Sequence, residues 1–316
     1  MTRKSSTLSQ GDRRAKRMAA LKRIAPLYVM LIPAVVYIVV FAYYPMYGAQ
    51  IAFRNFKITL GIWDSPWVGF DYFVRFFKSY NFVRIFTNTI YLSIYSLIAS
   101  TIVVVALSLI LHCVLRESFK KLVQTVIYLP HFISTVVIVG IVLRMLNPNL
   151  GVLSKLIQFF GGTDRDLMGV ASAFPHIYVW SGIWQNAGWG TVIYLAALAS
   201  ADSEHHEAAM IDGASRLQRL IHIDIPVLVP TIVIVLIMNL GRLIDVGYEK
   251  ILLMQNNLNL QKSEVIATYV YKIGLASNMP DYSLSTAVGL FNSVISLALV
   301  LIVNKVAKKL TETSLW

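Results

Sequence analysis

Residues 207–226 read EAAMIDGASRLQRLIHIDIP and lie between two long apolar runs of the chain. The segment is amphipathic and charged, whereas the runs that flank it carry no Asp, Glu, Lys or Arg. A polar stretch that interrupts so apolar a chain must be stabilised outside a bilayer, where its polar groups can be satisfied. We therefore expect this segment to be a surface on which a partner protein docks, with the function divided between chains.

The composition indicates an integral membrane protein. The 316 residues are 57% hydrophobic and 14% charged, with a mean hydropathy of +0.64, which exceeds the apolar share of soluble domains. A helix needs about 20 apolar residues to cross the hydrocarbon core, so charge-free runs of that length predict an all-α membrane protein with six transmembrane helices. The expected spans are 26–47, 85–113, 122–143, 173–201, 227–248 (charge-free to 241) and 284–304.

Prolines and basic residues refine this topology. Prolines such as Pro130 and Pro230 predict kinks and not breaks, because neighbouring helices can satisfy the carbonyls that they free. The polar N-terminal segment 1–25 holds the densest cluster of Lys and Arg, and such clusters stay in the cytoplasm. Six crossings return the C-terminus to the same side. We thus expect a multi-pass protein of the cytoplasmic membrane with both termini and the loop 202–226 in the cytoplasm, and one transmembrane domain over 26–316.

The sequence lacks the residues that several classes of transport protein require. With the fifth span ending at residue 241, the spans hold no Asp or Glu, whereas ion-coupled carriers keep such groups at membrane depth. No G-x-x-x-x-G-K-[ST] phosphate loop occurs, so an ATP-driven motor would be another polypeptide. A secondary carrier or channel that acts without an ATPase is the alternative.

Enzymatic, metal-binding and nucleic-acid-binding roles are not expected either. We find no converging catalytic residues, and the single cysteine, Cys113, excludes a Cys-rich metal site. His205 and His206 are adjacent and point in different directions on a helix, so we predict no metal site. The basic residues cluster as determinants of topology, which argues against nucleic acid as a partner.

The polar loop carries start and stop signals for helices. Asp202 or Ser203 can cap a first helix, and Gly213 permits a left-handed turn or a close backbone approach. A second helix can begin at Ser215, and Pro226 suits the first turn of the next span. The pattern predicts a helix-turn-helix. On periodicity alone, a partner-docking helix and an amphipathic helix at the membrane interface fit equally well.

A resemblance to a known family decides between these readings. Its residues in the loop are Glu207, Ala208, Ala209, Met210, Asp212, Gly213, Ala214, Ile223 and Pro226. They stand at the spacing of the EAA signature, between the fourth and fifth of six spans, and so the chain resembles the membrane subunits of ABC importers. Ile225 stands where that family usually has Leu. The resemblance extends from about residue 26 to the end and is similar to the carbohydrate-uptake, maltose-permease-like type.

Shorter motifs narrow this resemblance. They are YPMYG at 44–48, GIW at 61–63, SPWVG at 65–69 and SLW at 314–316. These motifs resemble those of permeases for polysaccharide-derived oligosaccharides, such as alginate or pectin fragments. They suggest a substrate class and not a particular sugar.

The resemblance implies the fold and partners of a type I ABC importer. The chain would be a permease subunit that moves a sugar by alternating access. Its partners would be a second homologous permease, two ATP-binding cassette ATPase subunits and an extracytoplasmic solute-binding protein. The chain itself would bind no cofactor, because ATP and Mg²⁺ belong to the ATPase subunits, and the EAA loop would sit in a cleft of one ATPase.

Sugar sites favour aromatic faces beside amides and hydroxyls. Such candidates lie in the fourth span and near the end of the fifth, namely Trp184, Gln185, Asn186, Trp189, Tyr194, Asn239, Arg242 and Tyr248. Gly182, Gly188 and Gly190 permit close helix approach, so the fourth span is the preferred lining of the pathway. Lys and Arg exceed Asp and Glu in the expected outer segments, which favours an anionic sugar such as a uronate. Contacts of those cations with lipid headgroups explain the excess equally well.

Overall fold

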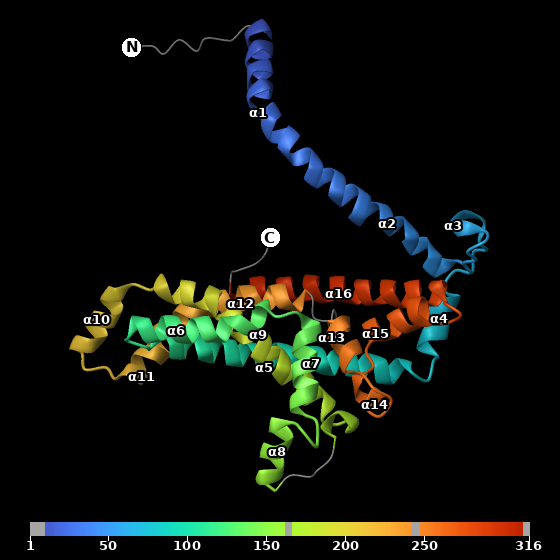
Figure 1. Ribbon diagram of the computed structural model, residues 1–316. Helices are drawn as coiled ribbons and strands as arrows, with labels where there is room; N and C mark the ends of the chain where they lie inside the picture. The colour runs from blue at the N-terminus through green and yellow to red at the C-terminus, as the bar shows by residue number, and fades with distance from the viewer. Residues whose placement is uncertain (1–9, 162–165, 242–246, 312–316) are drawn as a thin grey trace. The chain divides into compact units, whose positions relative to one another are not determined.

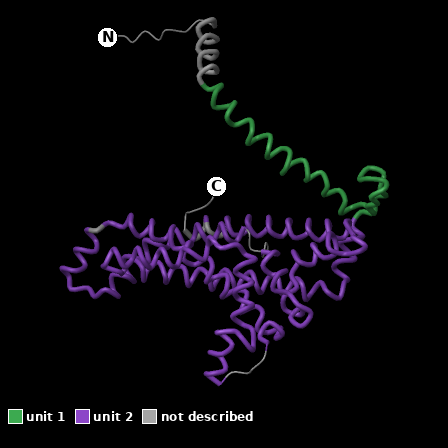
Figure 2. Tube along the Cα trace, in the orientation of Figure 1, with its two compact units in different colours: residues 1–69 green, residues 70–316 purple. Residues whose placement is uncertain are grey.

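The computed structural model describes residues 10–161, 166–241 and 247–311. All regular elements in these ranges are helices, and the ranges contain isolated β-bridges but no strand. The chain divides after Gly69 into two compact units, residues 1–69 and 70–316 (Figure 2). The boundary expected after residue 25 falls inside the first helix, Gln10–Ile38.

Residues 10–69 form a long N-terminal helix followed by an aromatic turn. The helical segments are α1 (Gln10–Ile38), a π-helical turn (Val39–Tyr43), α2 (Tyr44–Met46), a 3₁₀ segment (Tyr47–Phe53) and α3 (Gly61–Asp64). The Arg54 guanidinium donates hydrogen bonds to the carbonyls of Trp63 and Ser65, at 2.8 and 2.9 Å. It also lies 5.5 Å from the ring centroid of Trp67, and these contacts close the turn that contains the GIW and SPWVG motifs.

The described residues from 70 to 311 form a helical bundle. Its α-helices are α4 (Asp71–Phe77), α5 (Phe82–His112), α6 (Glu117–Tyr128), α7 (Thr135–Met145), α8 (Val152–Phe159), α9 (Phe174–Ala199), α10 (Ser203–Ile211), α11 (Arg216–Arg219), α12 (Ile225–Leu240), α13 (Tyr248–Met254), α14 (Leu260–Ser263), α15 (Ile266–Tyr271) and α16 (Tyr282–Thr311). Short 3₁₀ or π-helical pieces are Leu129–Phe132, Leu167–Gly169, Leu220–Asp224 and Lys272–Ala276. Helix α9 packs against α5, α6 and α12, and α12 packs against α16. Helices α10 and α11 lie at one end of this bundle, and α4 and α15 lie at the other (Figure 1).

Close packing around α9 depends on its glycines. A Cβ atom at Gly188 would overlap the backbone carbonyl of Ile127 in α6, and one at Gly190 would lie 3.1 Å from the Val104 side chain of α5. The expectation that glycines in this span permit close helix approach is confirmed at these positions. These glycines set the spacing between α9 and its neighbours α5 and α6. Helices α5 and α9 line the cavity described below.

The helices that meet the length and hydropathy of a membrane span differ in part from the six expected runs. They are Ile24–Phe53, Phe82–His112, Arg216–Leu240 and Tyr282–Lys305 among the described residues, with Glu117–Phe132 and Thr135–Met145 as a bent pair. Helix α9 has 26 residues but stays outside this group, since its Trp, Tyr, Gln and Asn residues lower its hydropathy. It nevertheless packs within the bundle against helices that do belong to the group.

Two expected spans need correction. The third, 122–143, is two helices that meet at 103°, so the segment around Pro130 is a break and not a kink. Proline removes a backbone donor and crowds the preceding turn, and Ile133 and Ser134 are extended. The fifth span does not reach Tyr248, because α12 ends at Leu240 and Tyr248 begins a separate helix.

Candidate functional site

The EAA segment begins with a capped helix. The Asp202 carboxylate accepts a hydrogen bond from the backbone N–H of Glu204 at 3.0 Å, which satisfies one donor that the first helical turn leaves free. Helix α10 then carries Glu207 and Ala208 on the surface and a half-buried Ala209. Of the two expected caps, the structure uses Asp202.

Gly213 ends this helix in the left-handed conformation. Its φ is +79°, a region that residues with a Cβ adopt at a cost. The turn lets the Ala214 N–H donate to the Ala209 carbonyl at 2.8 Å, after Asp212 has closed the last helical turn. The tight turn that the sequence predicts is therefore present, and it reverses the chain between α10 and α11.

The second helix begins with a capping box and continues into the membrane span. Ser215 accepts from the Gln218 N–H at 3.3 Å, and the Gln218 side chain accepts from the Ser215 N–H at 2.7 Å. From Arg216 the chain stays helical through Ile223 and Pro226 to Leu240. The helix-turn-helix is thus joined to α12 without a loop.

The surface of this segment is apolar in part. Met210 is 51% exposed, Ile211 is 86% exposed and Leu217 is 66% exposed. These side chains remain exposed among the described residues. They belong to the short helices α10 and α11 at one end of the bundle (Figure 1). A surface of this kind suits the small apolar contact of a docking helix.

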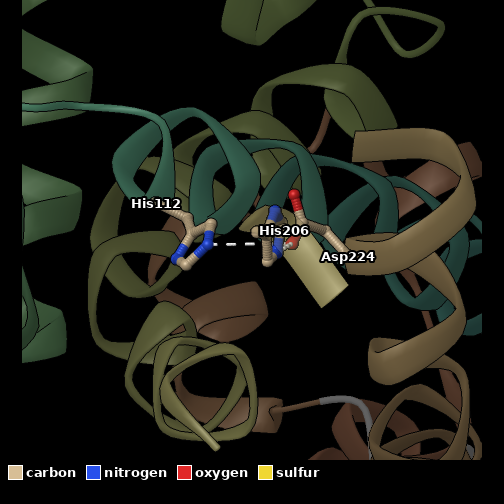
Figure 3. A group of neighbouring side chains, drawn as sticks. All are labelled: His112, His206 and Asp224. Atoms are coloured by element: carbon tan, nitrogen blue, oxygen red, sulfur yellow. Dashed lines mark ion pairs between the residues drawn. The ribbon is translucent and has the colours of Figure 1, made fainter. Parts of the chain in front are cut away.

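Three side chains beneath the loop meet in a way that the sequence did not reveal. His206 of α10 approaches Asp224, which directly precedes α12, with 3.1 Å between Nε2 and Oδ1. His112, at the end of α5, lies 3.7 Å from the same oxygen through its Nε2 atom. Figure 3 shows the three side chains together. The available signal was Asp224, an acidic residue at the edge of an apolar run, but its partners lie far away in the sequence.

A cavity of about 390 Å³ lies between α5, α9 and the ends of α12 and α13. Its wall is mixed polar and apolar and consists of Ser93, Ser96, Leu97, Ser100, Val104, Tyr178, Val179, Gly182, Ile183, Gln185, Asn186, Ala187, Asn239, Gly247 and Lys250. Hydroxyl, amide and ammonium groups thus face one space. Ligand pockets in proteins commonly combine such a few polar groups with an apolar wall.

The predicted pathway residues divide around this cavity. Gln185, Asn186 and Asn239 line it. Gln185 donates to the Ile133 carbonyl at 3.1 Å, and Asn186 donates to the Gly182 carbonyl at 3.1 Å while its Oδ1 atom lies 3.0 Å from His131 Nδ1. These bonds fix the amides in the wall beside the break between α6 and α7.

The aromatic candidates lie elsewhere. Trp184 and Trp189 are about half exposed, and Trp189 stacks on the His131 ring at a centroid distance of 5.0 Å. Tyr194 is buried in an apolar cluster with Leu198 and Leu228, where it serves packing. Tyr248 contacts Tyr271 at 6.0 Å between centroids. Arg242 lies outside the described residues.

Lys250 and the α5 serines are wall residues that the sequence reasoning missed. Lys250 is 9% exposed, and its ammonium donates to the Tyr178 carbonyl at 3.0 Å and lies 5.0 Å from the Tyr178 ring centroid. Burial lowers its pKa from 10.5 to about 8. Ser93, Ser96 and Ser100 share one face of α5 at helical spacing, which is the signal that could have found them.

Comparison with known proteins identifies the family. Residues 104–312 match the binding-protein-dependent transport system inner membrane component. The chain belongs to this family. It is 40% identical to Protein LplB of Bacillus subtilis (strain 168) over 299 residues, which are 95% of this chain and 93% of that protein. It is 37% identical to the polygalacturonan/rhamnogalacturonan transport system permease protein YteP of the same organism, over 96% of this chain and 94% of that protein.

Solved structures agree with this assignment. A crystal structure of a bacterial ABC transporter involved in the import of the acidic polysaccharide alginate contains a chain that is 36% identical, with a TM-score of 0.85. The match covers 94% of this chain and 99% of that chain. The same coverage and identity, with a TM-score of 0.86, hold for that transporter in complex with an alginate pentasaccharide-bound periplasmic protein. The expected all-α permease architecture is confirmed, and the protein is a multi-pass transport subunit of the inner membrane.

Proposed function

We propose that this permease imports an oligosaccharide and forms one half of a translocation pathway whose other half is a second homologous permease. Two ATPase subunits bind ATP and Mg²⁺ and drive the switch between outward-open and inward-open states. A solute-binding protein delivers the sugar at the outer face, as the periplasmic protein in the solved alginate complex suggests. The observation that carries this proposal is the EAA segment, which is folded as an exposed, capped helix-turn-helix joined directly to a membrane span.

The geometry of that segment supports its role in coupling. Glu207 and Ala208 are exposed on α10, and Gly213 sets the angle between α10 and α11. An ATPase cleft that holds α10 would move α12 with it, because no flexible loop separates α11 from the span. By linkage, ATP favours one state only through its different affinity for the two states. In this proposal, the EAA segment transmits the effect of ATP binding from the ATPase to the membrane span.

The substrate that we propose is an acidic oligosaccharide, such as an alginate or pectin fragment. Two similar proteins are named for acidic polysaccharides or their transport. The cavity supplies an ammonium at Lys250, amides at Gln185, Asn186 and Asn239, and α5 hydroxyls. A cation and several hydrogen-bonding groups in one wall suit a chain of sugars that carry carboxylates.

The orientation that we propose places both termini and the EAA segment in the cytoplasm. The basic residues of 1–25 and Lys305 and Lys308 support it through the positive-inside rule. Helices α10 and α11 then face the ATPases, while α4 and α15, at the opposite end of the bundle, face the binding protein (Figure 1).

Sugar-stimulated ATP hydrolysis tests the coupling role. The complex of both permeases, the ATPases and the binding protein would be reconstituted with wild-type chain or with Glu207→Ala. We expect the variant to lose stimulation, either by releasing the ATPase or by keeping it bound without coupling. Glu204→Ala removes an exposed carboxylate from the same helix and should retain stimulation. If inserted, folded Glu207→Ala keeps full stimulation, the coupling role is wrong; sugar uptake without any ATPase would instead favour a secondary carrier or channel.

A further inference from the structure

His112, His206 and Asp224 form a group that the transport role does not use. They come from three different elements: the end of α5, the EAA helix α10 and the π-helical segment Leu220–Asp224 that leads into α12. One donor atom from each lies within 4.8 Å of the other two. All three side chains converge on one point beneath α10 (Figure 3).

Asp224 is buried, and the hydrogen bonding of this group is incomplete. Asp224 is 3% exposed, and its Oδ1 atom makes no hydrogen bond to a described residue; the same holds for His206 Nε2, although the two atoms are 3.1 Å apart. A buried carboxylate oxygen that makes no hydrogen bond is costly. A cation held between Asp224 Oδ1 and the two imidazole nitrogens would satisfy the atoms that make no hydrogen bond.

We propose that His112, His206 and Asp224 bind a divalent transition-metal ion of the Zn²⁺ class. Two imidazole nitrogens and one carboxylate oxygen are a donor set that suits such an ion, with a water in the fourth position. Ligand atoms about 2.0–2.2 Å from a tetrahedral ion lie roughly 3.3 Å from one another. The distances of 3.1 and 3.7 Å to the shared Asp224 oxygen are near that value, and rotation of the imidazoles closes the remaining separation.

The bound ion joins the EAA helix to the bundle. It connects α10 to α5 and to the start of α12 through side chains alone, in addition to the backbone turn at Gly213. The ion therefore restrains α10 against the span that follows it. This role is structural or regulatory and includes no catalytic step.

Zinc binding to the full-length chain in lipid nanodiscs tests the proposal without ATP or sugar, so its failure is separate from failure of the transport role. The protein would carry a purification tag without histidine, and equilibrium dialysis against Zn²⁺ would give stoichiometry and affinity. We expect one Zn²⁺ per wild-type chain. Loss of an outer-shell partner already weakens metal sites by about 10- to 100-fold, so His206→Ala and Asp224→Asn should each weaken binding by at least about tenfold.

His205→Ala is the matched control. His205 is the next residue on α10, with its side chain 72% exposed, and its replacement should leave the affinity unchanged. Co²⁺ in place of Zn²⁺ gives absorption bands that report the coordination geometry, and these bands should vanish in His206→Ala. A wild-type chain without stoichiometric Zn²⁺, or equal weakening by His205→Ala and His206→Ala, overturns the proposal and leaves a His–Asp ion pair only.

A second measurement needs no variant, which matters if replacement of Asp224 unfolds the chain. Histidine-directed acylation of the wild-type protein, read by mass spectrometry, compares His206 with His205 in the same peptide. Zn²⁺ should protect His206 and leave His205 reactive. Equal modification of His206 with and without Zn²⁺ contradicts the proposal.

Discussion

At the scale of single residues, Lys250 links the cavity to the charge of the proposed substrate. It is buried in the wall, and burial lowers its pKa to about 8. Above that pH the uncharged amine dominates, whereas below it the ammonium is present. An acidic sugar gains from the ammonium and a neutral sugar does not, so the charge state of this residue should appear in the pH dependence of transport.

We predict that uptake of an acidic oligosaccharide falls as the pH rises from about 7 to about 9, since the lysine loses its proton over this range. Initial uptake rates in proteoliposomes that contain the complete transporter measure this. Lys250→Arg stays charged throughout and should remove that part of the decline, which separates the lysine from other titrating groups in the complex. Lys250→Met should lower the rate at the lower pH. Identical profiles for wild type and Lys250→Arg would rule the lysine out.

Residue patterns predict local caps and turns, but they do not predict contacts that depend on the tertiary fold. Asp202, Gly213 and Ser215 were predictable, because caps and turns depend on atoms a few residues apart. Tyr194 resembled the amide candidates in the same span, yet it packs in an apolar cluster, and only the rotation of α9 within the bundle determines that difference. The His206 and Asp224 contact joins elements that only the tertiary fold brings together.

At the scale of elements, the approach of α9 to α6 depends on the absence of a side chain. We predict that Gly188→Ala destabilises the protein by about 1–3 kcal/mol, the usual cost of overpacking, because the new methyl group meets the Ile127 backbone carbonyl. Thermal unfolding of the purified complex would measure the loss. Gly190→Ala would place its methyl group 3.1 Å from the Val104 side chain and not against a backbone atom, so it should cost less. An unchanged unfolding temperature for Gly188→Ala would show that α6 shifts freely.

Element boundaries followed the sequence where apolar runs were uniform. Helices α5 and α16 start and end within a few residues of the expected runs, apart from the longer C-terminal end of α16. The run 122–143 was wrongly predicted as one kinked helix, because hydropathy records composition and not chain direction. Pro130 and the extended residues after it turn the chain by 103°, although no Asp, Glu, Lys or Arg interrupts the run. The resulting corner places His131 beside Asn186 in the cavity region.

At the scale of the whole molecule, orientation can be read from one natural thiol. Cys113 follows the last residue of α5 and is exposed. In the proposed orientation it faces the cytoplasm, so a membrane-impermeant maleimide should label it in inverted vesicles and not in intact cells or spheroplasts. Labelling after detergent lysis gives the total available thiol as a control. Labelling of Cys113 in intact cells to the same extent as in inverted vesicles would contradict the proposed orientation.

The uninterrupted helix from Arg216 to Leu240 has a mechanical consequence. Its 25 residues span roughly 38 Å at 1.5 Å per residue, with Arg216 next to the EAA turn and Asn239 in the cavity wall. If such a lever pivots near its middle by 10°, each end moves by about 3 Å, from the same length. That distance is enough to make or break a hydrogen bond at Asn239. In the proposed orientation, a slight tilt imposed at the cytoplasmic end would thus change the contacts that Asn239 offers to the proposed sugar at the other end.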